Sequence, residues 1–390
     1  MTKKTDFCRY MALCVTYFVL LFCIINTNTM AQNATNVVLH NKNGWELGAH
    51  YGRIIKHTPI FLPSITESSS VFFLRHICQT NGSQLWHQYH HYPIVSWQGI
   101  YGRFGNRSVF GEGFGLVRSI GFVNRWDNFS LRYTLGSGLA YISRPYHRLN
   151  NTTNNVIGSH WNNCTTVQIS AVWQAANHWA VLGEGSLTHF SNARSQAPNL
   201  GINVAAAGVT LRYSFDTDIA PNQSATLPDL PPFVRSKWHI GMRLAYGQHA
   251  GETAWGPSFP IYVADVFVTK RWRPAWQFLA GVETNYYESI RWFVLNQVAF
   301  PSNQATAKAL KVAPYLGVES FFGRFSLLLT TGFYAYNPFL QRQPLPAKLG
   351  VQYYFRPTYQ HYGKQLLVGV YLRTHYANAD YFSAGMGYIF

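Results

Sequence analysis

The sequence predicts an all-β protein, a transmembrane antiparallel β-barrel, on three observations. The chain of 390 residues is 47% hydrophobic but only 12% charged, whereas soluble proteins usually carry about 25% charged residues. Aromatic residues make up 16% of it, which is typical of barrels with aromatic girdles. Beyond the N-terminus, no apolar run reaches the roughly 20 residues that a membrane helix needs. Apolar residues instead alternate in short stretches, as in strands with one lipid-facing side.

The N-terminus, residues 1–31, is predicted to be a signal peptide. It has a basic region up to Arg9, an apolar core from Met11 to Ile25, and a small-residue cleavage site ending at Ala31. We therefore expect an exported protein. The formal net charge of +16 suits anionic lipid headgroups, and an exported barrel is not expected to bind nucleic acid.

The clearest predicted strand covers residues 129–143. Leu131, Tyr133 and Leu135 share one face of it, and Arg132 and Thr134 share the other. The same alternation predicts eight strands in the first half, at 45–57, 70–80, 85–104, 108–122, 129–143, 163–176, 178–191 and 202–215. The long polar segment 144–162 should then lie outside the membrane, since barrels carry their longer loops there.

The chain is predicted to contain two related barrels. Residues 32–215 form the first, the Pro-containing segment 216–237 is a linker, and residues 238–390 form a second, degenerate copy. The hairpin sequence Thr188–Ala193 recurs as Thr374–Ala379. Two tandem eight-stranded barrels are favoured over one sixteen-stranded barrel, which requires that 202–215 pair with 45–57. The alternating strand that ends at Phe390 is typical of bacterial outer-membrane barrels.

Three polar side chains interrupt the apolar face at one end of the first barrel. His189 and Ser191 lie two residues apart on a strand and so share a face, and Asn203 lies on the same face of the next strand. The imidazole could remove the serine proton, the serine could attack an ester carbonyl, and the amide could hold the useful tautomer of the histidine. The alternative is that these are ordinary polar residues of the interfacial girdle.

The motif around these residues, His189–Ala193 followed by Pro198–Ile202, resembles that of the lipid A 3-O-deacylases (PagL family). The resemblance covers about residues 40–215. It implies an eight-stranded outer-membrane barrel that removes an ester-linked acyl chain from lipid A, a carboxylic ester hydrolase whose partners are lipopolysaccharide and outer-membrane lipids. It also implies that Ser191 is the nucleophile and His189 the base, and that Asn192 and the backbone around Ala193 line the oxyanion hole. No metal or cofactor is expected.

One residue departs from the family pattern, because Asn203 stands where the family has Glu. The outer-membrane phospholipase A barrels use His, Ser and Asn at this spacing, so a phospholipase that requires calcium and dimerisation stays an alternative. A homodimer is therefore left open. A further alternative, from another class, is a non-enzymatic structural or pore-forming barrel.

Other polar residues are interpreted as structural. In the second copy Ala377 replaces the serine, so that half is predicted to be structural or a binding accessory. Glu184 should face the interior of the first barrel, with Arg132 as one partner. His87, His90 and His91 are not expected to form a metal site, because His90 and His91 should point to opposite faces of a strand.

Overall fold

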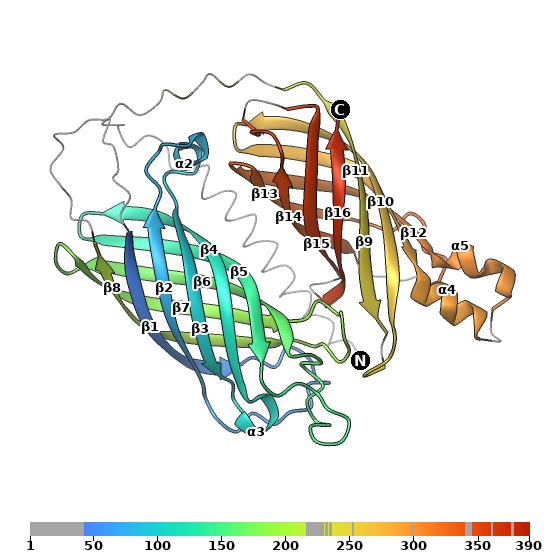
Figure 1. The fold of residues 1–390 in the computed structure, drawn as a ribbon, viewed down its shortest axis with the longest axis horizontal. Helices are drawn as coiled ribbons and strands as arrows, with labels where there is room; N and C mark the ends of the chain where they lie inside the picture. The colour runs from blue at the N-terminus through green and yellow to red at the C-terminus, as the bar shows by residue number, and fades with distance from the viewer. Residues whose placement is uncertain are drawn as a thin grey trace. The chain divides into compact units, whose positions relative to one another are not determined.

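The computed structural model describes residues 43–215, 230, 233, 236–251, 253–297, 300–339, 345–359, 362–375 and 378–390. Each half of the chain forms its own closed eight-stranded barrel (Figure 1). The predicted signal peptide 1–31 and most of the predicted linker 216–237 lie outside the described residues. Among the residues described, no helix is long and apolar enough to cross a membrane.

The first barrel closes between its first and last strands. Leu47 of β1 lies opposite Leu211 of β8, and the pairing continues to Ile54 and Val204. This confirms the predicted closure and with it the two-barrel architecture. The strands are β1 (Asn43–Ile54), β2 (Ser69–Gln79), β3 (Ile94–Arg103), β4 (Glu112–Trp126), β5 (Phe129–Ile142), β6 (Trp161–Gln174), β7 (Trp179–Ser191) and β8 (Ile202–Ser214).

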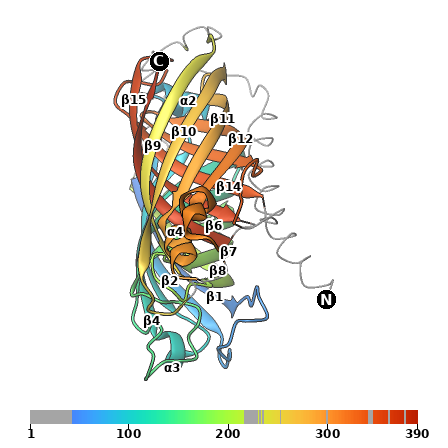
Figure 2. The same cartoon turned by 90° about the vertical axis from the view of Figure 1, so that its right-hand side faces the viewer.

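The second barrel closes in the same way, because β9 pairs with both β10 and β16. Its strands are β9 (His239–Ala250), β10 (Ser258–Arg273), β11 (Trp276–Tyr287), β12 (Leu310–Phe322), β13 (Phe325–Gly332), β14 (Pro346–Tyr354), β15 (Gln365–His375) and β16 (Asn378–Ile389). The β11–β12 connection carries the helices α4 (Glu288–Leu295), η1 (Ser302–Gln304) and α5 (Ala305–Ala309). Figure 2 shows α4 face-on to the viewer.

Two predicted strands, 85–104 and 108–122, begin with short helices instead. Residues Leu85–Tyr89 form α2 and Arg107–Phe110 form α3. The Asn106 side chain caps α3 by accepting from the amides of Ser108 and Val109. These local hydrogen bonds outweigh the alternation that suggested a strand.

The histidine cluster of the β2–β3 connection therefore needs a correction. His87 lies within α2, His90 is its C-cap, and His91 follows with a φ of 56°. None of the three lies on a strand, so the predicted opposite-face arrangement is wrong. His90 instead packs edge-on against the ring of Phe122.

The first barrel has an apolar outer face and a charged interior. Outward side chains such as Leu47 and Val209 are 65% and 62% exposed, as expected of a wall that faces lipid. Inside, Arg132 donates to Glu46 at 2.7 Å and to Glu184 at 3.1 Å, and Arg75 bridges the same two carboxylates. The predicted Glu184–Arg132 pair is thus confirmed, and a side-chain network fills the interior.

The interior of the second barrel follows the same rule with different residues. Asp265 accepts from Arg243 at 2.9 Å, and Glu283 accepts from Arg373 at 2.6 Å. Lys348 bridges the two carboxylates. Buried charges are stable only when they are paired, and in each lumen the carboxylates named here are paired with buried Arg or Lys side chains.

Candidate active site

The β7–β8 hairpin brings two of the predicted site residues into direct contact. His189 lies opposite Asn203 in the register, and both share the outward parity of Leu187 and Val209. His189 Nδ1 lies 2.7 Å from Asn203 Oδ1. An amide oxygen can only accept, so Nδ1 carries the proton and Nε2 is left as the basic nitrogen.

A second histidine, which the sequence reasoning missed, adjoins this pair. Asn203 Nδ2 lies 2.9 Å from His57 Nδ1, and His57 Nε2 lies 3.0 Å from the carbonyl oxygen of Leu200. His57 follows β1, which pairs with β8 across the barrel seam. Burial lowers the pKa of His57 below its usual value, which favours the neutral ring.

Ser191 ends β7 and contacts the side chain of Asn199. Asn199 Nδ2 donates to Ser191 Oγ at 2.9 Å, and Asn199 Oδ1 lies 3.2 Å from the same oxygen. Asn199 belongs to the Pro198–Ile202 motif of the sequence, but no role was assigned to it there. Its amide hydrogens lie beside the oxygen that would attack a substrate, which suits an oxyanion donor.

The residues after Ser191 turn sharply. The backbone amide of Asn192 donates to Asn199 Oδ1 at 3.1 Å, and the Asn192 side chain donates to Ser159 Oγ at 2.9 Å. Ala193 and Arg194 have φ angles of 53° and 64°, a left-handed conformation that is uncommon outside glycine. Within this turn, the Asn199 side chain contacts both Ser191 Oγ and the backbone amide of Asn192.

Gly201 allows the hairpin loop to approach the imidazole. Its φ is +79°, and a Cβ atom there would lie 2.7 Å from His189 Cε1. No real Cβ fits at that distance, so a side chain would displace the histidine ring. Gly201 N also donates to the carbonyl of Val156 at 3.0 Å, which holds the loop in place.

The site is on the outward face but is shielded. Ser191 and Asn203 are only 8% and 7% exposed, whereas Val209 further along β8 is 62% exposed. His57 covers Asn203, and Asn199 covers Ser191. The outward position matches the prediction, and the covering residues give the polar groups a hydrogen-bonded setting on an apolar wall.

In the second barrel, the corresponding histidine lies inside. His375 Nε2 contacts the hydroxyl of Tyr334 at 2.7 Å, and His375 Nδ1 lies 3.6 Å from Asp380. Asp380 also accepts from Tyr287 at 2.6 Å. Ala377, which replaces the serine, lies outside the described residues. These contacts bind His375 into the packed interior.

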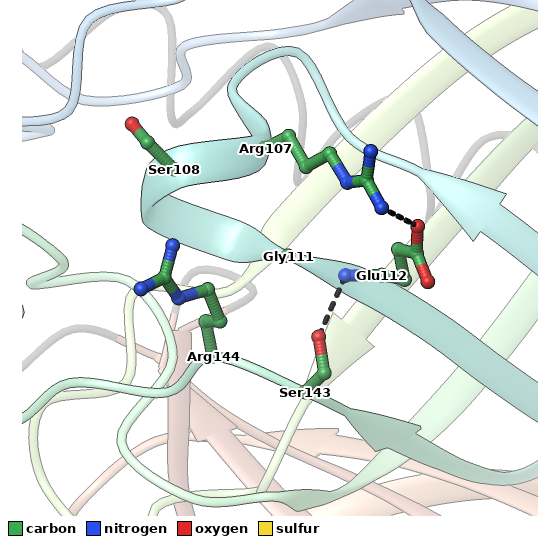
Figure 3. A pocket seen from close by; sticks show the side chains of 6 residues that line it. All are labelled: Arg107, Ser108, Gly111, Glu112, Ser143 and Arg144. Carbon is green, nitrogen blue, oxygen red and sulfur yellow. Dashed lines mark hydrogen bonds and ion pairs between the residues drawn. The ribbon is translucent and has the colours of Figure 1, made fainter.

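A hollow opens between the β3–β4 connection and the end of β5 (Figure 3). Arg107 forms a 2.8 Å ion pair with Glu112 there, and Ser143 accepts from the Glu112 amide at 2.7 Å. The hollow lies at the ends of β4 and β5, whereas Ser191 ends β7, two strands beyond β5 in the ring, and none of the predicted site residues lines the hollow. Within the described part of the chain, no cluster of three or more His, Cys, Asp or Glu is arranged to hold a metal.

Each half of the chain matches a known protein family. Residues 71–215 match the family model "Lipid A 3-O-deacylase (PagL)", and residues 237–390 match "Acyloxyacyl hydrolase, C-terminal domain". No curated protein matches the chain.

Two kinds of solved structure resemble it. The crystal structure of the outer membrane enzyme PagL is 15% identical, covers 43% of this chain and 98% of its own, and has a TM-score of 0.29. A mutant porin of Rh. blastica is 9% identical, with coverages of 90% and 99% and a TM-score of 0.16. The two family models together span both barrels, and the chain belongs to the PagL and acyloxyacyl hydrolase family of outer-membrane β-barrels.

Proposed function

We propose that the first barrel is an outer-membrane esterase that removes an ester-linked 3-hydroxyacyl chain from lipid A by Ser-His-Asn catalysis. The observation that carries this proposal is the 2.7 Å contact between His189 Nδ1 and Asn203 Oδ1. It leaves His189 Nε2 as a base on the same strand face as Ser191. Residues 32–215 would be the catalytic barrel.

The first chemical step forms an acyl-enzyme. Ser191 Oγ attacks the ester carbonyl carbon while His189 Nε2 takes the hydroxyl proton. The carbonyl oxygen becomes an oxyanion, and Asn199 Nδ2, already 2.9 Å from Ser191 Oγ, is placed to donate to it, together with the backbone around Ala193. The Asn192 amide, which donates to Asn199 Oδ1, holds Asn199 in this position. When the carbon–oxygen bond of the ester breaks, His189 returns the proton to the departing sugar oxygen.

The second step releases the fatty acid. Water attacks the acyl carbon and gives a proton to His189, the bond to Ser191 Oγ breaks, and the serine regains its proton. Every proton is handled by His189, and the amide of Asn203 holds that ring in place throughout. The scheme draws on side chains and backbone amides of the first barrel and on water, with no step that involves a metal or cofactor.

The position of the site supports a lipid substrate. Ser191 ends β7 at the barrel end that carries the 55–68, 143–160 and 192–201 connections, and the longer loops of such barrels are external. Lipid A occupies that leaflet, and the matching family is described as a lipid A 3-O-deacylase. The amide at position 203 keeps a phospholipid as the second candidate, because phospholipase A barrels use the same three residue types.

Mass spectrometry of purified lipopolysaccharide and of phospholipid vesicles, each incubated with the detergent-folded protein, tests the proposal. We expect lipid A to lose one 3-hydroxyacyl chain. Lysophospholipid as the only product would favour the second candidate, and no product from either lipid would contradict the proposal. Ser191→Ala should abolish the reaction. Ser137→Ala, which removes an exposed strand serine of the same barrel, is the matched control.

The second barrel is proposed to be structural or a binding accessory. Its histidine at the corresponding hairpin, His375, is engaged with Tyr334 and Asp380 in the interior. A chain truncated after the first barrel, within residues 216–237, would test whether that barrel alone retains ester hydrolysis.

A further inference from the structure

An asparagine in the third position of a catalytic triad has a problem that a carboxylate does not have. Both oxygens of a carboxylate accept hydrogen bonds, so either orientation holds the histidine correctly. An amide has one oxygen and one NH2 group, and if it flips it donates to Nδ1 and selects the wrong tautomer. In serine proteases, replacing the triad aspartate by asparagine lowers kcat about 10⁴-fold for this reason. Asn203 therefore needs a neighbour that fixes its orientation.

With a neutral His57 ring, the contacts from Leu200 to His189 define the direction of the hydrogen bonds around Asn203. The carbonyl oxygen of Leu200 has no proton, so His57 Nε2 must donate to it across 3.0 Å. The neutral His57 ring then has a lone pair on Nδ1, which accepts from Asn203 Nδ2 at 2.9 Å. With its nitrogen so engaged, Asn203 presents Oδ1 to His189 at 2.7 Å.

The fold fixes His57 where this chain of bonds requires it. The amide of Ile55 donates to the backbone oxygen of Asn203 at 2.8 Å, so the segment after β1 is tied to β8. The ring of Phe61 lies edge-on to the His57 ring at 6.5 Å between centroids. Phe61 itself is buried. Burial also disfavours the imidazolium form, in which Nδ1 could no longer accept.

We propose that His57 is a positioning residue that orients the amide of Asn203, and through it selects the catalytic tautomer of His189. This inference rests on the proposed esterase function and deepens it. His57 does not touch the reacting atoms. It ensures that Asn203 presents an acceptor oxygen to His189, which a carboxylate does in either orientation. Asn203 and His57 therefore act as one unit.

Two substitutions of His57 separate its two nitrogens. In His57→Asn the side-chain oxygen stands near the position of Nδ1 and can still accept from Asn203. In His57→Gln the amide nitrogen stands near the position of Nε2 and can still donate to Leu200, but the acceptor is lost. We expect His57→Asn to keep kcat within about threefold of the wild type, and His57→Gln to lower kcat at least about tenfold with little change in KM.

A control and a double variant exclude a merely structural role. His178 also donates to a backbone carbonyl, that of Ser214 at 2.8 Å, and lies at the other end of the barrel. His178→Gln should leave kcat unchanged. Asn203→Asp has no amide to orient, so adding His57→Gln to it should cost less than about threefold. Equal losses for His57→Asn and His57→Gln, or an undiminished loss in the Asn203→Asp background, would overturn the inference.

A readout without turnover separates this inference from the proposed function. Nitrogen NMR of the detergent-folded protein reports the tautomer of His189. We expect the Nδ1–H form in the wild type and in His57→Asn, and a mixture of tautomers in His57→Gln. If no lipid is hydrolysed while the tautomers follow this pattern, the esterase proposal fails and the positioning role stands. A wild-type-like His189 tautomer in His57→Gln refutes the positioning role, whatever the activity.

Discussion

The two barrels place the same Thr-His dipeptide on opposite faces of the seventh strand of each barrel. In β7, His189 follows the outward parity of Leu187, which is exposed. In β15, His375 follows the inward parity of Arg373, which is buried. The pairing of β15 with β16 is irregular at this point, because Asp380 of β16 is passed over. The alternation of β15 itself continues from Arg373 to His375, so the Thr-His dipeptide of β15 has the opposite phase to that of β7. The local sequence alone therefore does not determine the chemistry.

The largest expected effect is on the outward site. Ser191→Ala and His189→Ala should each lower ester hydrolysis at least about 10⁴-fold, because nucleophile and base act as a unit. Product formation from lipopolysaccharide measures this, and heat-modifiable gel mobility should show that both variants remain folded. Near-normal turnover in Ser191→Ala would rule out Ser191 as the nucleophile. It would also remove the proposed chemical difference between the two barrels.

The oxyanion donor should come next in size. Asn199→Ala removes the NH2 group that contacts Ser191 Oγ, and we expect kcat to fall about 10²-fold with a smaller change in KM. Asn163→Ala, on the exposed outer face of β6 opposite Ser191, is the control and should change kcat little. If kcat survives in Asn199→Ala, the oxyanion must be bound by the Asn192–Ala193 backbone alone.

The inward site of the second barrel should matter for stability instead. Asp380→Ala removes the acceptor of the Tyr287 hydroxyl and the carboxylate beside His375, and should lower the free energy of unfolding by about 2 kcal/mol. Denaturant titration followed by gel mobility measures it. Asn378→Ala, which removes an exposed side chain on the same strand, is the control. Loss of esterase activity in a folded Asp380→Ala protein would contradict a structural role for this site.

The slope of the pH profile at low pH should test the role of His57. Burial lowers the pKa of His57, so the neutral form persists as pH falls below about 6.5, the usual value. Once pH drops through the lowered pKa, His57 binds a proton at Nδ1, and both the acceptor for Asn203 and the associated stability are lost. With His189 also protonated, log activity should fall with a slope near 2 in the wild type and near 1 in His57→Asn. A slope that is the same in both proteins would argue against His57.

The smallest expected effect is a null result. Ala377→Ser restores a His-x-Ser sequence in the second barrel, but His375 is engaged with Tyr334 and Asp380 in the interior. In a Ser191→Ala background we expect no hydrolysis from Ala377→Ser. Any serine-dependent product would mean that His375 can still act as a base.

Most of the fold could be predicted, because alternation and barrel closure are repeated over many residues. The hairpin pair His189 and Asn203 was also within reach, since it is local in sequence. His57 was not found, because it is 146 residues from Asn203 and no motif links them. A signal did exist. Closure of β1 on β8 pairs Ile54 with Val204. Because of this register, the residues that directly follow β1 lie at the level of Asn203.

The helices α2 and α3 were missed for a different reason. Their sequences are rich in aromatic and polar residues that also suit strand ends, and α2 has no side-chain cap that would have marked its start. In α3 a capping contact marks the start of the helix. Asn106 accepts from two backbone amides at the start of α3, and such side-chain contacts are invisible to periodicity.

The seam between the first and last strands of the first barrel has a consequence for biogenesis. His189, Ser191 and Asn203 lie on one hairpin, but His57 reaches them only after β1 has joined β8. If His57 acts as proposed, a nascent chain in transit carries the reactive groups without their orienting partner. Hydrolytic power would then appear only with completed insertion, and the inner membrane would be spared while the protein passes through it. The onset of lipid hydrolysis would accordingly report when β1 pairs with β8 and the barrel closes.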